Sequence, residues 1–189
     1  MVTNNAHQGE TSSDRLNRLS SDPVEAIGTL LNSIDNHFNN EIRQTISDTT
    51  NPQTSLLFLG IHAAILTIGE VFYNLGQPER NYTQVLEQYV DGTTPDTQFS
   101  NIATEIHKWR NIVAHQWIGI QGHSIDYDYK MSLGWERRNG ILFINPKIYC
   151  EHYLAAFQNG GKLWDFENIF TSQELIDIQN RIIVKYQRQ

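Results

Sequence analysis

The 189-residue chain has a single cysteine, Cys150. One thiol cannot form an intramolecular disulfide, and it cannot hold a zinc ion by itself. Disulfide frameworks and cysteine-rich metal modules are therefore excluded, so stability has to come from a packed core. Apolar residues make up 39% of the chain and aromatic residues 11%, which is enough to build one.

Motifs of several common enzyme classes are also missing. The sequence has no G-x-x-x-x-G-K-[ST] loop, no G-x-G-x-x-G, no G-x-S-x-G and no H-E-x-x-H. Common nucleotide-binding, hydrolase and metalloprotease classes are thereby disfavoured. His107, His115 and His123 recur every eight residues, but no cysteine accompanies them and a helix break precedes His123. We therefore expect no metal site and no other cofactor.

Targeting signals are scarce as well. The first 22 residues lack the apolar stretch of a signal peptide. The richest apolar run, residues 56–75, contains His62 and Glu70, which favours a buried helix over a membrane span. We expect a cytoplasmic protein without a membrane partner.

Positive charge is sparse in the first part of the chain. Residues 1–105 hold 4 of the 14 Lys and Arg residues and 13 of the 21 Asp and Glu residues, a balance of −9. The remaining residues have a balance of +2, within a net charge of −7 for the whole chain. A broad basic face for nucleic acid is not supported, whereas a local basic site in the second half is allowed.

Helical periodicity dominates the first two thirds of the chain. Residues 1–20 lack it and predict a flexible tail, followed by a single domain over residues 21–189. The apolar spacing predicts an amphipathic helix that begins at Ser21-Asp22-Pro23 and ends near residue 48. It then predicts a buried helix over about 53–75, a short one near 82–89 and a fourth over about 97–118. Short connections between these helices indicate an up-down bundle of antiparallel neighbours.

The pattern changes after residues 119–122. Asn139-Gly140 stands between two apolar runs, which predicts a small β-hairpin near residues 127–144. Two further helices follow, from Asn145-Pro146 to about residue 158 and from Ser172 onward. The fold class is therefore mainly α: a bundle of four to five helices with a C-terminal extension, about residues 120–189, of a hairpin and two additional helices.

Chemistry-bearing residues are concentrated at residues 105–117. Asn111 and His115 are four residues apart and share a helix face, whereas Arg110 lies roughly 140° from His115 around the axis. A second subunit in a shared cleft would make their convergence easier. Histidine can exchange a proton near neutral pH, Arg matches a phosphate, and Asn can orient either group. Such a trio suits RNA cleavage by attack of the substrate's own 2′-hydroxyl, which requires no metal.

The segment Arg110-Asn111-Ile-Val-Ala-His115 resembles the R-x(4–6)-H signature of HEPN domains, in which a polar residue commonly follows the Arg. The resemblance covers roughly residues 21–120 and implies a helical bundle with the motif on a late helix. By position it makes Arg110 and His115 catalytic and Asn111 supporting. It also implies an acidic residue facing the motif from an earlier helix, for which Glu70 is the candidate.

The resemblance implies a metal-independent endoribonuclease of toxin or phage-defence type. Such proteins are usually homodimers that act on RNA, and some pair with a nucleotidyltransferase-type antitoxin. The superfamily also includes members without activity. The alternative is therefore a catalytically silent interaction domain that binds a partner protein or a nucleotide, and a third reading is a helical protein in which the motif is structural.

Several residues near the motif have both a functional and a structural interpretation. His107 and Lys108 are expected to support the site, and Glu70 pairs with Arg110 either as an orienting partner or as a structural salt bridge. Trp109 and Trp117 either stack on a splayed base or, by default, pack in the core. Outside this segment, His62 is expected to be a satisfied core histidine, and Arg137 and Arg138 form either solvated surface or a basic rim.

Overall fold

The computed structural model describes residues 10–47, 54–116 and 125–187, without the side chains of residue 54 and residues 111–116. This part of the chain is mainly helical and includes a small three-stranded sheet. In chain order the α-helices are α1 (Ser12–Ser21), α2 (Pro23–Ser33), α3 (Asn40–Ser47), α4 (Thr54–Phe72), α5 (Pro78–Val85), α6 (Ala103–Gln116), α7 (Pro146–Ala155), α8 (Phe166–Ile169) and α9 (Ser172–Gln187). A π-helical segment, Ile34–Asn39, joins α2 to α3, so the single amphipathic helix predicted there is a continuous rod with one irregular stretch.

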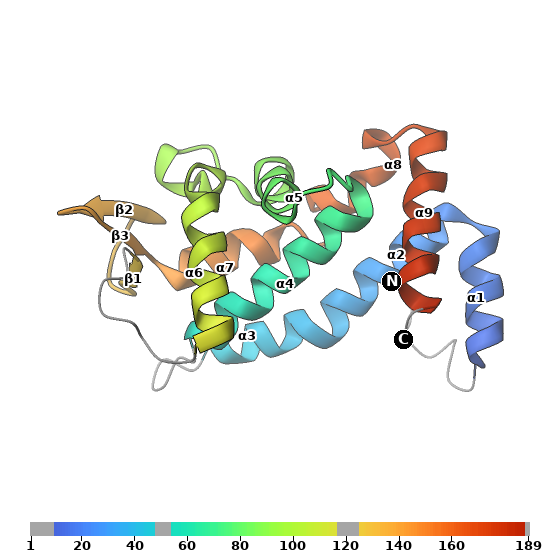
Figure 1. Cartoon of the computed structure of the whole chain (residues 1–189), viewed down its shortest axis with the longest axis horizontal. Coiled ribbons are helices and arrows are strands. Elements are labelled where there is room, and N and C mark those ends of the chain that lie inside the picture. Colours follow the sequence, from blue (N-terminus) through green and yellow to red (C-terminus); the bar gives the residue numbers. More distant parts are fainter. Residues whose placement is uncertain (1–9, 48–53, 117–124, 188–189) are drawn as a thin grey trace.

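Helix α4 forms the centre of the molecule, with α6 crossing near one end and α9 near the other (Figure 1). Its residues Ile61, Ile65, Ile68 and Val71 have no exposed surface, as expected for the most apolar helix of the chain. The stretch Ser55–Phe72 is long and apolar enough to cross a membrane by length and composition, with a mean hydropathy of 1.8. In this structure 56% of that stretch is buried inside the protein.

The small sheet contains the predicted hairpin around Asn139-Gly140, with a shorter first strand than predicted. Strand β2 (Trp135–Arg138) pairs antiparallel with β3 (Ile141–Ile144), and the turn residues Asn139 and Gly140 have φ values of 52° and 82°. Positive φ at both positions is the geometry that an Asn-Gly hairpin turn requires. The prediction was wrong for residues 129–133, which form no strand. Instead β1 (Ile125–Tyr127) adds to β3 in parallel, giving the order β1-β3-β2.

The C-terminal helices belong to the same core as the first helices. In α7, Tyr149 is fully packed, and its hydroxyl lies 2.8 Å from the hydroxyl of Tyr82 in α5. Ile178 and Ile182 of α9 are buried as well. Two additional helices were predicted after the hairpin, and the structure has α7, α9 and the single-turn α8 between them.

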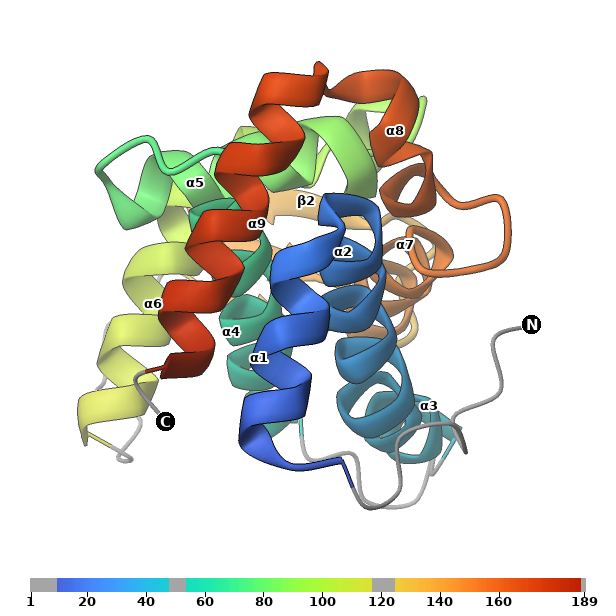
Figure 2. The same cartoon turned by 90° about the vertical axis from the view of Figure 1, so that its right-hand side faces the viewer.

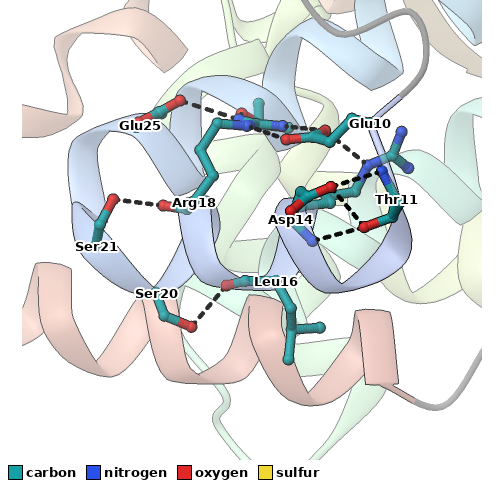
Figure 3. Close-up of polar contacts among 10 residues, drawn as sticks. Glu10, Thr11, Asp14, Leu16, Arg18, Ser20, Ser21 and Glu25 are labelled. Atoms are coloured by element: carbon teal, nitrogen blue, oxygen red, sulfur yellow. Dashed lines mark hydrogen bonds and ion pairs between the residues drawn. The ribbon is translucent and has the colours of Figure 1, made fainter.

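The prediction of a flexible tail over residues 1–20 is wrong for the part that the structure describes. Thr11 and Asp14 form a reciprocal capping box at the start of α1, and Leu19 is fully buried. Arg18 donates hydrogen bonds to Glu10 and Glu25, as Figure 3 shows. In Figure 2, α1 lies beside α2 and α9, the two helices it contacts most. Residues 1–9 of the predicted tail are outside the described part.

Candidate functional site on helix α6

Helix α6 has one face in the core and one in solvent. Ile102, just before it, and Ile106 and Trp109 within it are at most 8% exposed, whereas Thr104 and Lys108 are exposed. The backbone of α6 is helical through Gln116, so the prediction that the motif segment is helical is confirmed. Ile106 and Trp109, one turn apart, anchor the helix on α4.

Trp109 packs in the core, which is the default interpretation of this residue, and the alternative role as a base-stacking residue is corrected. It is 8% exposed, and its ring meets Phe58 of α4 at 5.9 Å and Tyr127 of β1 at 5.5 Å between centroids. Both contacts are edge-on, an arrangement typical of packed aromatic residues. Trp117, the other stacking candidate, lies outside the described residues.

A pair of histidines joins α4 to α6. Nε2 of His62 lies 3.1 Å from Nδ1 of His107, within hydrogen-bonding distance. The His62 ring also stacks on Tyr82, with centroids 4.3 Å apart. His62 is 1% exposed, and its Nδ1 has no hydrogen-bond partner among the described residues. The expectation of a buried core histidine is met, but only one of its two ring nitrogens is satisfied.

Both histidines are held in the neutral form near pH 7. Burial, which is the largest cause, and the electrostatic effects of His107 and Arg110 together lower the pKa of His62 to about 3. Burial also lowers the pKa of the half-buried His107, and Arg110 acts in the same direction, whereas the nearby Glu79 raises it. In a neutral pair one ring donates the hydrogen bond and the other accepts it, because each ring has one donor and one acceptor nitrogen.

Arg110 belongs to this polar cluster. It is half-buried on α6, three residues after His107, and its charge is close enough to affect both histidines. The backbone of Asn111 and His115 is helical, while their side chains are outside the description. At 100° per residue, positions 111 and 115 fall on the stripe of exposed Thr104 and Lys108, and Arg110 falls on the stripe of His107. Arg110 is therefore on a different stripe of α6 from positions 111 and 115.

Glu70 has another role than the one predicted for it. Its carboxylate accepts a hydrogen bond from Nζ of Lys185 in α9 at 2.5 Å, so the ion pair that the structure records joins α4 to α9. Helix α4 meets α6 at His62, and Glu70 lies eight residues further along, about 12 Å at 1.5 Å per residue. Because α6 crosses α4 at the other end, the pairing with Arg110 is corrected.

Arginine side chains near α6 are compensated by carboxylates. Arg137 in β2 forms an ion pair with Glu105 of α6, and Arg138 forms ion pairs with Asp128 and Glu136. The Arg137–Glu105 pair ties the sheet to α6, and all three pairs offset the positive charge of the rim that the two arginines could have formed. Among the described residues, Lys108 is the exposed cation of the α6 surface.

Sequence spacing did not predict the histidine pair. His62 and His107 are 45 residues apart, and only the crossing of α4 over α6 brings them together. The available signal was a histidine on an otherwise apolar helix, which implies a polar partner without identifying it. Within the described ranges, no group of three or more His, Cys, Asp or Glu side chains could hold a metal ion. His123 is outside those ranges.

Comparison of the chain with protein-family models, curated proteins and solved structures found no match.

Proposed function

We propose that the protein is a HEPN-type, metal-independent endoribonuclease that works as a homodimer in toxin or phage-defence function. The observation that carries the proposal is a helix, α6, that continues through Gln116 and bears Arg110 inside a polar cluster. His115 would be the general base and acid, Arg110 would bind the scissile phosphate, and Asn111 would orient them. His107 and Lys108 support the site, the first beside Arg110 and the second on the exposed stripe.

The proposed dimer follows from the placement of Arg110. Within one chain, Arg110 and position 115 lie on different stripes of α6, so one chain does not bring the two groups together by register alone. Two α6 helices facing each other would place the Arg110 of one subunit near the His115 of the other. A nucleotidyltransferase-type protein would be the antitoxin partner in this setting, and the cytoplasm the compartment.

The test is an RNA-cleavage assay on mixed cellular RNA with EDTA present. We expect cleavage that leaves 2′,3′-cyclic phosphate ends, and a fall of roughly 100- to 10,000-fold in His115→Ala and Arg110→Ala. Two control variants remove exposed residues away from the motif: His37→Ala in the π-helical segment and Lys147→Ala in α7. Both should cleave RNA at the wild-type rate. Circular dichroism and sedimentation check that each variant keeps its fold and oligomeric state.

A second candidate function, a catalytically silent HEPN-like domain that binds a partner protein, is favoured by the paired arginines and the buried Trp109. A ribonuclease surface with few free cations and no stacking ring at position 109 would hold RNA weakly. Absence of cleavage by a folded dimer would support this candidate. Equal cleavage by wild type and His115→Ala would also contradict the ribonuclease proposal, because the activity would then come from elsewhere.

A further inference from the structure

A second polar site lies away from the motif, where α9 packs on the junction of α4 and α5. A pocket of about 500 Å³ opens there, a volume within the range of small-molecule sites. Figure 2 shows α9 crossing in front of α4 on this side of the molecule. The residues that line the pocket come from α4, α5, α9 and the loop between α4 and α5, and they include Glu70, Asn81, Arg181, Val184 and Lys185.

The walls of this pocket are fixed by hydrogen bonds. The α4–α5 loop turns through positive φ angles at Asn74 and Gly76, 49° and 76°. The Leu75 backbone N–H donates to Oδ1 of Asn81 at 2.8 Å, which holds the loop on α5. Arg181 donates from Nε and Nη2 to the carbonyl oxygens of Val71 and Phe72, so α9 is attached to the last turn of α4. A ligand would therefore meet a preformed site.

Several lining side chains carry hydrogen-bond donors, and Asn81, Arg181 and Lys185 are the ones on which the argument rests. Asn81 lines the pocket although it is only 3% exposed; its Oδ1 accepts from Leu75, and the described residues offer no recorded acceptor for its amide Nδ2. Arg181 uses two of its five N–H groups on the α4 carbonyls, and the described structure gives the other three no acceptor. Lys185 stands one helical turn after Arg181 on the same wall.

The described lining of the pocket has one carboxylate as a charged hydrogen-bond acceptor. Glu70 is the carboxylate of the lining, and it is paired with Lys185 at 2.5 Å. The side chains of this pair are about two-fifths exposed, 42% and 40%, so the pair is weak and the ammonium can reorient at low cost. With Arg181 included, the charged lining residues sum to one net positive charge. The N–H groups of Arg181 that have no recorded acceptor, together with this positive balance, are complementary to an anion.

We propose that this pocket binds a small anion through a phosphate or carboxylate group. The group would accept hydrogen bonds from Asn81 Nδ2 and the open side of the Arg181 guanidinium, whose fork matches two oxygens of one anion. Lys185 would add its charge. Val184, 44% exposed at the pocket wall, gives an apolar contact for the carbon part of an organic anion. This site is independent of the proposed ribonuclease activity, because none of the α6 side chains that the structure describes lines it.

The test is a titration of the full chain with inorganic phosphate, glycerol phosphate and butyrate, followed by the amide NMR signals of residues 74–81 and 180–185. We expect saturable shifts confined to these residues. Arg181→Lys, which keeps the charge but loses the fork, should weaken binding about 10- to 100-fold. Asn81→Asp should abolish binding: the new carboxylate still accepts from Leu75, but it replaces the free donor with a negative charge. Lys185→Gln should weaken binding without touching the backbone contacts.

Lys147→Gln is the matched control, because Lys147 also forms an exposed ion pair on a helix, with Glu151 of α7. Its affinity should equal that of the wild type. Saturation by the phosphates alone assigns the pocket to phosphate esters, and saturation by butyrate as well assigns it to organic anions in general. Absence of saturable shifts for all three probes, or equal affinity in Arg181→Lys and the wild type, overturns the proposal. Should Asn81→Asp fail to fold, Arg181→Lys and Lys185→Gln still decide.

Discussion

Replacing Gly69 by alanine is expected to lower the free energy of unfolding by about 2 kcal/mol. Gly69 lies in α4 where α5 passes closely, and a Cβ atom there would come within 2.6 Å of the backbone oxygen of Asn81. Because the obstructing atom is main chain, a helix must move to relieve the overlap. Alanine gains about 1 kcal/mol over glycine in helix propensity, which offsets the clash only in part. The midpoint of urea unfolding measures the balance.

Gly28 of α2 provides the matched control, since a Cβ at that position meets nothing within 4 Å. Gly28→Ala should therefore raise the free energy of unfolding by roughly 0.5–1 kcal/mol, the propensity gain alone. The two substitutions make the same chemical change in two helices and are expected to have opposite signs. If both stabilise the protein, α4 and α5 do not approach as closely as the structure shows.

Local sequence patterns predicted those helices and turns whose conformation depends mainly on residues close together in the chain. The apolar spacing over residues 24–46 predicted the α2–α3 rod, and Asn139-Gly140 predicted the turn between β2 and β3 because only such residues adopt its backbone angles at low cost. Helix α1 was missed because it has few apolar residues. Its order depends on distant contacts, including the bond from Gln179 of α9 to the carbonyl of Leu19, separated by 160 residues. Spacing along one helix carries no information on such contacts.

The candidate site likewise has features that the local sequence predicts and features that depend on which helices meet. The helical character of the motif segment and the positions of Arg110 and His115 on it follow from sequence. Which helices meet does not, so Glu70 was assigned to Arg110 although α9 supplies its partner Lys185. Trp109 shows the same limit: an aromatic residue in a motif can stack on a base or pack in a core, and only the neighbouring Phe58 and Tyr127 decide.

The buried His62 makes the protein sensitive to mild acid. Its pKa is about 3 in the folded protein and 6.5 in the reference state, because burial disfavours the charged ring and the charges of His107 and Arg110 add to the effect. Between these values the unfolded chain takes up a proton that the folded chain does not. The free energy of unfolding therefore falls as pH falls, by about 1.4 kcal/mol for each pH unit below the reference value. Above the reference pKa the stabilising effect is fully present.

His62→Phe is expected to remove this contribution. Phenylalanine can keep the stacking on Tyr82 and has no orphaned Nδ1, while the half-buried His107 can replace its lost partner with water. At about pH 7 the variant should unfold at nearly the same urea concentration as the wild type. At about pH 5 it should be more stable than the wild type by about 2 kcal/mol, the protonation cost that it no longer bears. The carboxylates and the histidines away from this pair are common to both proteins, so the difference between the two curves reports on the His62–His107 pair. Parallel curves would show that His62 is protonated in the folded protein as readily as in the unfolded chain, and the neutral histidine pair would then be wrong.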